Sequence, residues 1–498
     1  MRGWSLKAAC AAAALALLPG IAPGSASAQA RTDLVVGMQL EPPNLDPTAS
    51  AAAAIAEVTL VNLYEALTRI DAEGNVGPGL AKSWTVSEDQ TTYTFTLRDA
   101  AKFHNGKPAT AADVKFTLDR ARAADSTNPQ KAWFKAIADV QAPDAKTVVV
   151  RLSQPDGLFL FHMGLGAAVI QSPETQLTDK QTPIGTGPFK FERWIAGDRV
   201  VLVRNPDYDG PKPALERVSF RFIADPAAQV STILAGDVDT VPQFNTYEAL
   251  PQFRNDPRFR ITVGTSEGET LLSTNNARKP FDDVRVRRAL AHAIDRKTLI
   301  EGAMLDLAPA IGSHFSPSRA EYVDLTGTYP YDVKKAKALL AEAGYPQGFE
   351  TTLRLPPPIY ARRSGELIAA MLAEAGVRLK IENMEWAQWL EKVFRGKDFD
   401  LTIVAHTEAL DIEIYSRPDY YFGYRSDRFN ALNAELERSL DPAKRKALYG
   451  DMQRVLAEDA VNGFLFQLPV VTVENAKLVG MWKNRPYQVN DVTGVRWR

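Results

Sequence analysis

The chain is poor in the residues that build covalent links and metal centres. It holds one cysteine, Cys10, so it can form no internal disulfide and no cysteine-based metal site. The histidines are few, dispersed and without a His-Glu-x-x-His pattern: His104, His162, His292, His314 and His406. Because closely spaced His and Cys ligands are typical of zinc sites, the sequence predicts no metal site and no cofactor. Nickel carried inside a chelator stays open as an alternative.

Long apolar runs are also missing after the first twenty residues. Arg2 and Lys7 precede an apolar run at residues 8–18, and small residues at 26–28 or 28–30 offer a cleavage site. This layout predicts a secretory signal peptide over residues 1–28, with cleavage possibly at 30, and a soluble periplasmic product. The run is shorter than the roughly 20 residues of a membrane-spanning helix. Cys10 lies inside the run and not after it, which disfavours lipid attachment.

Neither sign of charge dominates the chain. Basic and acidic residues number 58 and 60, and removal of residues 1–28 takes away only Arg2 and Lys7, which leaves a formal charge of −4. The densest basic group, Arg285 with Arg287 and Arg288, belongs to an apparent amphipathic helix. Nucleic acids and anionic membranes select clustered Lys and Arg on a basic domain, so neither is expected as a partner.

Periodicity predicts a mixed α/β chain. Its 45% hydrophobic composition and its length suit two or three lobes. Strands are predicted at residues 33–38, 92–98, 147–152, 200–204, 218–223, 269–274, 353–355, 378–381 and 400–404, with a strand pair around Pro469 at 464–473. Helices are predicted at residues 51–67, 114–123, 226–235, 284–294 and 333–343. Their caps are a Thr110/Asp113 capping box, Asp282 or Asp283, and Asp332, with stops at Gly236 and Gly344.

Residues 182–189 read Thr-Pro-Ile-Gly-Thr-Gly-Pro-Phe. Gly185 and Gly187 permit positive φ angles and Pro183 and Pro188 fix φ, so the segment predicts a defined bend. Further short motifs follow or precede it in a fixed order: Leu45-Asp46-Pro47, residues 93–114 with Phe103-His104-Asn105-Gly106, Asn205-Pro206-Asp207-Tyr208, Ala235-Gly236-Asp237-Val238-Asp239, Pro280-Phe281-Asp282-Asp283, residues 285–296 and residues 336–344.

Taken together over residues 34–478, these motifs resemble the family 5 solute-binding proteins, the extracytoplasmic receptors of peptide, nickel and opine ABC importers. The resemblance implies a hinge-connected, two-lobed α/β fold of the periplasmic-binding-protein type (type II), in which a ligand is enclosed when the lobes close. It implies lobe I at residues 31–61, 183–270 and 468–498, an inserted subdomain at 62–182, and lobe II at 271–467.

The implied function is capture of a small peptide-like, opine-like or oligosaccharide solute and its delivery to ABC permease subunits, by a monomer without enzymatic activity. In peptide-binding members an aspartate after a strand takes the ligand amino group and an arginine takes the carboxylate. The corresponding segment here, residues 406–413, lacks the family's tryptophan and Asp-Pro pair but offers His406, Glu408 and Asp411. The short loop that would supply the arginine ends at Tyr360. An amino-bearing or polar ligand of another shape is therefore as compatible as a dipeptide.

Further ligand-binding candidates come from both halves of the chain. Trp386 and Trp389 share a helix face and suit stacking or cation–π contact, or else pack the lobe. Glu41 and Asn44 follow the first strand, where ligands gather, although Pro42-Pro43 makes a rigid turn equally possible. Asn245 and Asn275 are expected on the hinge side.

Two alternatives to a solute receptor remain at this stage. Residues 264–268 match the Gly-x-Ser-x-Gly form of a hydrolase elbow, which would make Ser266 the nucleophile of a secreted serine hydrolase. The motif requires a helix after the serine, whereas residues 269–274 predict a strand. The other alternative is a sensing or chaperone protein that binds another protein.

Overall fold

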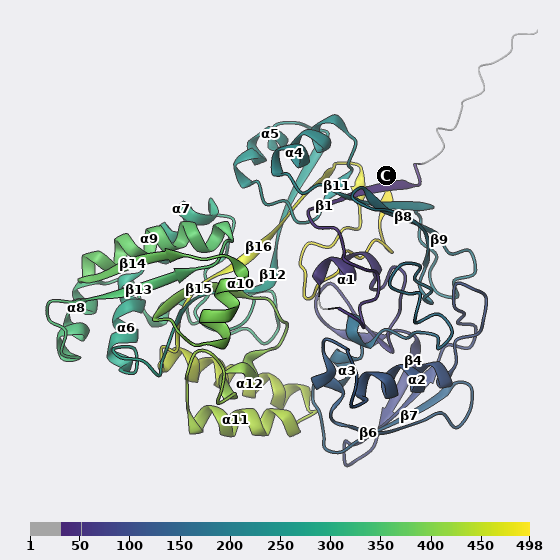
Figure 1. Cartoon of the computed structure of the whole chain (residues 1–498), viewed down its shortest axis with the longest axis horizontal. Helices are drawn as coiled ribbons and strands as arrows, with labels where there is room; N and C mark the ends of the chain where they lie inside the picture. The colour runs from purple at the N-terminus through teal and green to yellow at the C-terminus, as the bar shows by residue number, and fades with distance from the viewer. Residues whose placement is uncertain (1–30, 51) are drawn as a thin grey trace, which may run out of the picture. The chain divides into compact units, whose positions relative to one another are not determined.

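The computed structural model describes residues 31–50 and 52–498, and Thr32–Arg498 form one unit (Figure 1). The predicted signal peptide lies outside the described residues. Within that unit a ten-stranded mixed sheet has the order β14-β13-β15-β12-β16-β11-β1-β10-β9-β8. None of the helices in the described ranges is long and apolar enough to cross a membrane.

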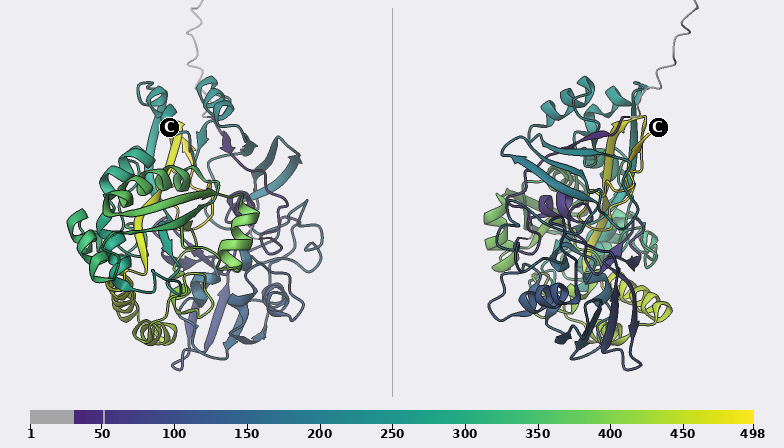
Figure 2. Two further views of the ribbon diagram at one scale, coloured as in Figure 1. Left: turned by 60° about the vertical axis from the view of Figure 1, so that its left-hand side comes forward. Right: turned by 90° about the vertical axis from the view of Figure 1, so that its right-hand side faces the viewer.

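Two long antiparallel strands join the halves of this sheet: β12 (Phe259–Thr274) and β16 (Asn462–Asn475). One end of β12 pairs with β15 and the opposite end of β16 pairs with β11. Figures 1 and 2 show β12 in teal and β16 in yellow side by side. We call the part built on β1 and β8–β11 the first lobe and the part built on β13–β15 the second lobe. The resemblance to the family implies two lobes joined by two crossing strands, and β12 and β16 are these strands.

Both crossing strands are longer than the sequence predicts. The predicted strand 269–274 is the end of β12, and the predicted pair at 464–473 is a single strand, β16. Pro469 does not divide β16 because it lies opposite Thr265, where the register between the strands shifts before Glu269. An irregular position of this kind accommodates a residue without a backbone N–H group.

The main apolar core of the first lobe covers one face of parallel β1 and β10, and a smaller apolar cluster that includes Val238 and Phe244 packs against Val35 on the other face of β1. Asp225 caps α4 by accepting from Ala228 N, a cap that the sequence analysis did not name, and Gly236 ends the helix in the left-handed conformation, at the predicted stop. The elements are β1 (Asp33–Met38), α1 (Ala53–Thr59), β2 (Thr68–Ile70), β3 (Val76–Pro78), β8 (Phe189–Ile195), β9 (Arg199–Arg204), β10 (Arg217–Phe222), α4 (Pro226–Ala235), β11 (Thr240–Val241), α5 (Leu250–Arg254), β17 (Leu478–Val479) and β18 (Arg496–Trp497).

A separate antiparallel sheet of order β4-β5-β7-β6 lies between β3 and β8 in the sequence. The predicted capping box is confirmed, because Asp113 Oδ2 accepts from Thr110 N over 2.9 Å at the start of α2. The elements are β4 (Ala81–Val86), β5 (Thr92–Leu97), α2 (Ala111–Arg122), β6 (Ile137–Gln141), β7 (Thr147–Leu152) and α3 (Phe159–His162).

The second lobe combines parallel β13 and β14 with helices that pack on one another. Asp283 caps α6 and Asp332 caps α8, as predicted. The elements are α6 (Val284–Ala293), α7 (Arg296–Met304), α8 (Val333–Glu342), β13 (Phe349–Leu355), α9 (Ile359–Ala375), β14 (Val377–Asn383), α10 (Trp386–Trp389), β15 (Leu401–His406), α11 (Asp427–Arg438) and α12 (Pro442–Glu458).

The helix predicted at residues 51–67 is wrong in its length. It ends at Thr59, and the chain turns through a left-handed Val61. The backbone beyond that turn pairs with the Gly-Thr-Gly-Pro segment, since Leu63 O accepts from Gly187 N over 2.9 Å. Gly185 and Gly187 do not adopt the positive φ angles that glycine permits. They are needed because a Cβ atom on Gly185 would lie 2.0 Å from Leu63 O.

Candidate functional site

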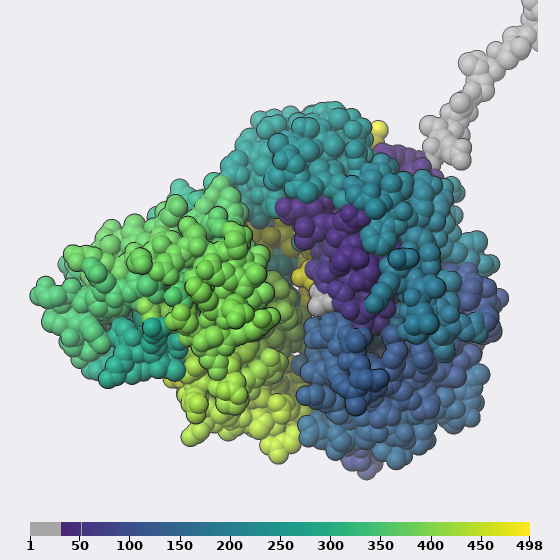
Figure 3. Space-filling model, in the orientation of Figure 1, coloured from purple at the N-terminus to yellow at the C-terminus, as the bar shows by residue number. Residues whose placement is uncertain are grey.

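The surface of the described unit is hollowed between the second lobe, in green, and the segment after β1, in purple (Figure 3). The predicted site residues come from both sides of this hollow. Glu41 and Asn44 follow β1, Asn245 follows β11, and the others belong to the second lobe. Their contacts separate residues that serve the fold from residues whose polar groups remain available to a ligand.

The three candidates of the first lobe hold loops together. Glu41 Oε1 accepts from Trp194 Nε1 at 2.8 Å and from Gly197 N at 3.1 Å, which ties the β8–β9 hairpin to the end of β1. Asn44 Oδ1 accepts from the backbone of Asp46. Asn245 Nδ2 donates to Gln39 Oε1 at 3.0 Å, so the segments after β1 and β11 are linked.

Asn275 and Tyr360 have comparable internal contacts in the second lobe. The buried Asn275 donates through Nδ2 to Lys397 O and Phe399 O, each at 3.1 Å, and so fixes the turn before β15. The Tyr360 hydroxyl accepts from Ala405 N at 3.0 Å, and burial raises the pKa of this phenol to about 12. Both residues shape the ends of β15.

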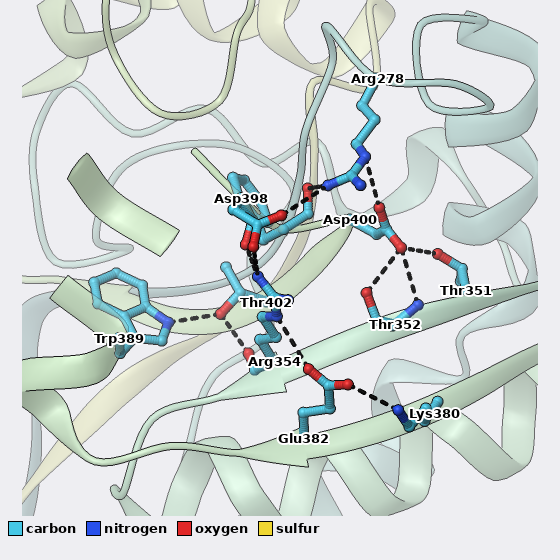
Figure 4. A network of polar contacts seen from close by, with 11 residues as sticks. Arg278, Thr351, Thr352, Arg354, Lys380, Glu382, Trp389, Asp398, Asp400 and Thr402 are labelled. Carbon is cyan, nitrogen blue, oxygen red and sulfur yellow. Dashed lines mark hydrogen bonds and ion pairs between the residues drawn. The ribbon is translucent and has the colours of Figure 1, made fainter. Parts of the chain in front are cut away.

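The two tryptophans of α10 differ in exposure although they are neighbours. Their ring centroids lie 5.6 Å apart with nearly perpendicular planes. Trp389 is 3% exposed and donates through Nε1 to Thr402 Oγ1 at 2.9 Å (Figure 4), whereas Trp386 is 42% exposed. Leu390 and Phe394 are exposed at helical spacing from Trp386, so this part of the lobe presents an apolar surface.

Figure 4 also shows what holds β13, β14 and β15 in register beside Trp389. Arg354 on β13 pairs with Glu382 at 3.1 Å and with Asp398 at 2.8 Å. Asp400 accepts from Thr351 and Thr352 and pairs with Arg278 at 3.2 Å. These polar groups form hydrogen bonds and ion pairs with one another. The network therefore holds the aromatic surface in place and offers no unbonded polar group to a ligand.

His406 lies among aromatic rings at the end of β15. Its Nε2 atom is 3.0 Å from the Tyr421 hydroxyl and its Nδ1 atom 3.4 Å from the Tyr420 hydroxyl. The imidazole stacks on Tyr421 with centroids 6.0 Å apart. Burial lowers the pKa of His406 to about 4, so the ring is neutral near pH 7.

Asp411 lies beside a histidine that the sequence did not single out. Its Oδ1 atom is 2.7 Å from His314 Nε2, and His314 Nδ1 is 3.3 Å from the Tyr415 hydroxyl. Burial raises the pKa of Asp411 to about 7, and the charge of Glu408 adds to the shift. Glu408 is exposed and accepts only from the neighbouring Thr407 N in the described structure. Glu408, Asp411 and His406 offer ligand atoms within 4.8 Å of one another.

Acidic residues of β12 are further members of this region that sequence reasoning missed. Glu267 and Glu269 are buried, and burial raises the pKa of Glu267 to about 7 and that of Glu269 as well. Glu267 lies 3.4 Å from the guanidinium of Arg319, which is also buried. The sequence did contain a signal for these buried acids. Glu267 and Glu269 occupy alternate positions of a strand that continues with apolar residues, and carboxylates are rarely buried without a partner.

Ser266 has no arrangement for nucleophilic catalysis. It lies inside β12, so no helix follows it, and its hydroxyl donates to Leu468 O at 2.9 Å while accepting from Gly268 N at 3.0 Å. A nucleophile elbow needs a strand-to-helix turn that exposes the serine. The hydrolase alternative is therefore not supported.

His104 is structural, as its position in a turn suggests. Gly185 N donates to its Nδ1 atom at 3.2 Å, so the proton is on Nε2, which donates to Gly187 O at 3.1 Å. These bonds join the Asn105-Gly106 turn to the Gly-Thr-Gly-Pro segment. The Asn105-Gly106 turn and the Gly-Thr-Gly-Pro segment therefore contact each other directly.

Comparison with known proteins agrees with this fold. The family model for bacterial extracellular solute-binding proteins, family 5 Middle, matches residues 75–424. A protein of Brucella ovis described as an ABC transporter peptide-binding protein is 31% identical over 432 residues, which are 79% of each chain.

Solved structures show the same architecture. The ABC transporter-associated periplasmic binding protein DppA of Helicobacter pylori, in complex with the peptide STSA, superposes with a TM-score of 0.78 at 26% identity, over 94% of this chain and 98% of its own. AgaA from A. tumefaciens R10, in complex with agropinic acid, superposes with a TM-score of 0.76 at 26% identity, over 94% and 99%. Such proteins bind solutes for ABC importers and are not enzymes. This chain therefore belongs to family 5 of the bacterial extracellular solute-binding proteins.

Proposed function

We propose that the chain captures a peptide-like or opine-like solute with a positively charged amino group and delivers it to the permease of an ABC importer. The supporting observation is a row of aromatic rings that ends on two carboxylates. Centroid separations are 5.6 Å from Trp386 to Trp389, 6.1 Å from Trp389 to Tyr421 and 6.0 Å from Tyr421 to His406. Next to His406 lie Glu408 and Asp411.

The two exposed ends of this row, Trp386 and Glu408, suit an ammonium group attached to an apolar or planar body. Aromatic faces attract cations with about 0.5–2 kcal/mol. A hydrogen bond from an ammonium to a carboxylate contributes about 1.5–3 kcal/mol. Glu408 is the exposed acid of the pair and Trp386 the exposed ring, so these two side chains are the solute contacts we propose first. Oligosaccharides also stack on aromatic rings, so their affinity for the chain is to be compared with that of the amino-bearing solutes.

We also propose the accompanying organisation. Residues 1–28 are the signal peptide, the mature chain is a periplasmic monomer, and residues 62–182 are a subdomain inserted in lobe I. The four-stranded sheet at residues 81–152 supports the last point. The lobe boundaries remain those at residues 183, 271 and 468.

The test is calorimetric titration of the purified chain, unfolded and refolded to remove carried solute, with peptides of two to five residues, opines and oligosaccharides. Glu408→Gln should weaken binding of amino-bearing solutes by about ten- to a hundredfold, the equivalent of one charged hydrogen bond. Asp419→Asn, at an exposed acid near Lys397, is the matched control and should bind normally. Absence of binding by every solute class to folded protein would contradict the proposal, and equal affinity in the Glu408 variant would remove the assigned role of that residue.

A further inference from the structure

Three segments of the chain bring one acid, one histidine and another acid together below the surface of the second lobe. Glu269 belongs to β12, His314 to the chain between α7 and α8, and Asp411 to the segment after β15. Each offers one donor atom, and the three donor atoms lie within 4.8 Å of one another. None of these residues is near another in the sequence, so the fold alone creates the group.

All three side chains are removed from solvent. Glu269 is 1% exposed, and the side chains of His314 and Asp411 are 0% and 11% exposed. His314 and Asp411 are hydrogen-bonded to each other, and His314 also contacts Tyr415. Glu269 Oε2, in contrast, has no hydrogen-bond partner in the described part of the chain. A buried acceptor without a donor costs about 1–3 kcal/mol, which a ligand at this position would recover.

The charge of the group favours a cation. Burial raises the pKa of Glu269, and the negative charges of Asp411 and Glu267 raise it further, so the two carboxylates oppose each other's ionisation. The facing positive charges are Arg319, near Glu269, and Arg417, near Asp411, and neither guanidinium is bonded to Glu269. A positive ion between the carboxylates would stabilise both in their charged form.

The size of the site selects a metal ion over an organic cation. The three donor atoms lie within 4.8 Å of one another, so a single ion can contact all of them, whereas an organic cation needs more space than separates them. Two carboxylates with one imidazole suit the divalent first-row transition metals, which accept nitrogen and oxygen ligands. The neutral His314 ring has a nitrogen lone pair to offer once its bond to Asp411 is exchanged for the metal.

We propose that Glu269, His314 and Asp411 bind a divalent transition metal ion, with Zn²⁺ as the probe. Three protein ligands leave a coordination position for water or for a donor atom of a bound molecule. His406 and Glu408 form a second group with Asp411, in which His406 is buried and Glu408 is exposed. The site shares Asp411 with the proposed solute surface, whereas Glu269 and His314 are not among the proposed solute contacts and can be changed separately.

The experiment titrates the chain, freed of metal by a chelator and containing no added solute, with ZnCl₂ and in parallel with NiCl₂. One ion per chain is expected. Glu269→Gln keeps the size of the side chain and removes its charge, and His314→Gln removes the imidazole; each should weaken Zn²⁺ binding at least tenfold. His162→Gln, a histidine of α3 outside the group, is the matched control and should bind as the unaltered chain does.

Two outcomes would overturn the site: no stoichiometric metal binding, or binding that Glu269→Gln and His314→Gln leave unchanged. Should His314→Gln fail to fold by circular dichroism, Glu269→Gln together with the visible absorption of the Co²⁺-loaded chain decides, since loss of nitrogen and carboxylate ligands changes the cobalt spectrum. Solute titration of Glu269→Gln separates the two proposals. Retained solute affinity with lost Zn²⁺ affinity supports the metal site, and loss of both shows a disturbed lobe and overturns it.

Discussion

The backbone nitrogen of Gly187 donates to the carbonyl oxygen of Leu63 over 2.9 Å, and this bond joins the Gly-Thr-Gly-Pro segment to the chain that leaves α1. Gly185, two residues earlier, lies so close to the same carbonyl that a Cβ atom would be 2.0 Å from its oxygen. The motif is thus a packing site for a neighbouring backbone. Glycine is required in this motif because it has no side chain that would collide with the neighbouring backbone.

Gly185→Ala should destabilise the protein by at least about 2 kcal/mol, because the clash is with backbone that cannot rotate away. Chemical denaturation monitored by circular dichroism measures the effect. Gly327→Ala is the control, since a Cβ atom there meets nothing within 4 Å and φ is not positive. Equal stability of the two variants would show that the Leu63 segment moves aside.

The tryptophans of α10 should respond differently to truncation. Trp389→Ala removes a buried ring with a hydrogen bond to Thr402 and should cost about 3–5 kcal/mol of stability. Trp386→Ala should change stability little and weaken solute binding, because its ring is exposed at the proposed contact surface. Thermal unfolding and calorimetry of both variants check the split; a large loss of stability in Trp386→Ala would argue against the assignment.

Glu57 and Arg485 form a buried ion pair of the first lobe. Their charged atoms lie 3.1 Å apart, and Gln243 Nε2 donates to the same carboxylate oxygen at 2.7 Å. Glu57→Gln leaves the guanidinium buried without its counter-charge, and a loss of about 3–5 kcal/mol is expected in denaturant unfolding. Asp451→Asn, which breaks an exposed pair with Arg454, should cost less than about 1 kcal/mol. Similar losses in both variants would contradict the difference in burial.

His162 should make stability depend on pH. Burial lowers the pKa of this residue to about 3, and its ring stacks on Trp133 with centroids 4.5 Å apart. The contribution of the neutral His162 ring to the free energy of unfolding is complete above the unfolded-state pKa of about 6.5. It is lost as pH falls toward 3, because over this range the histidine is protonated in the unfolded chain but not in the folded one.

His162→Phe keeps a ring on Trp133 and removes the titration. The fall in melting temperature between about pH 7 and about pH 4 should therefore be smaller in this variant than in the unaltered chain. Buried groups common to both proteins, such as His104, contribute equally and cancel in the difference. An identical fall in both proteins would show that His162 is protonated in the folded state.

Local patterns in the sequence determined many of the elements. The helix Pro226–Ala235 was predicted with both of its ends. In the structure Asp225 and Gly236 cap it, and each acts within one helical turn of the residues it caps. The order of short motifs was sufficient to identify the family and, through it, the two lobes. These features depend on neighbouring residues or on the order of segments, and both can be read along the chain.

Only the tertiary structure decided which of those residues meet. Trp386 and Trp389 share a helix face, yet the position of β15 buries one and leaves the other exposed. Glu269, His314 and Asp411 come together because the crossing strand β12, the chain between α7 and α8 and the segment after β15 meet at one place. Contacts of this kind join segments distant in sequence. Their geometry depends on the packing of the whole lobe, which no local spacing records.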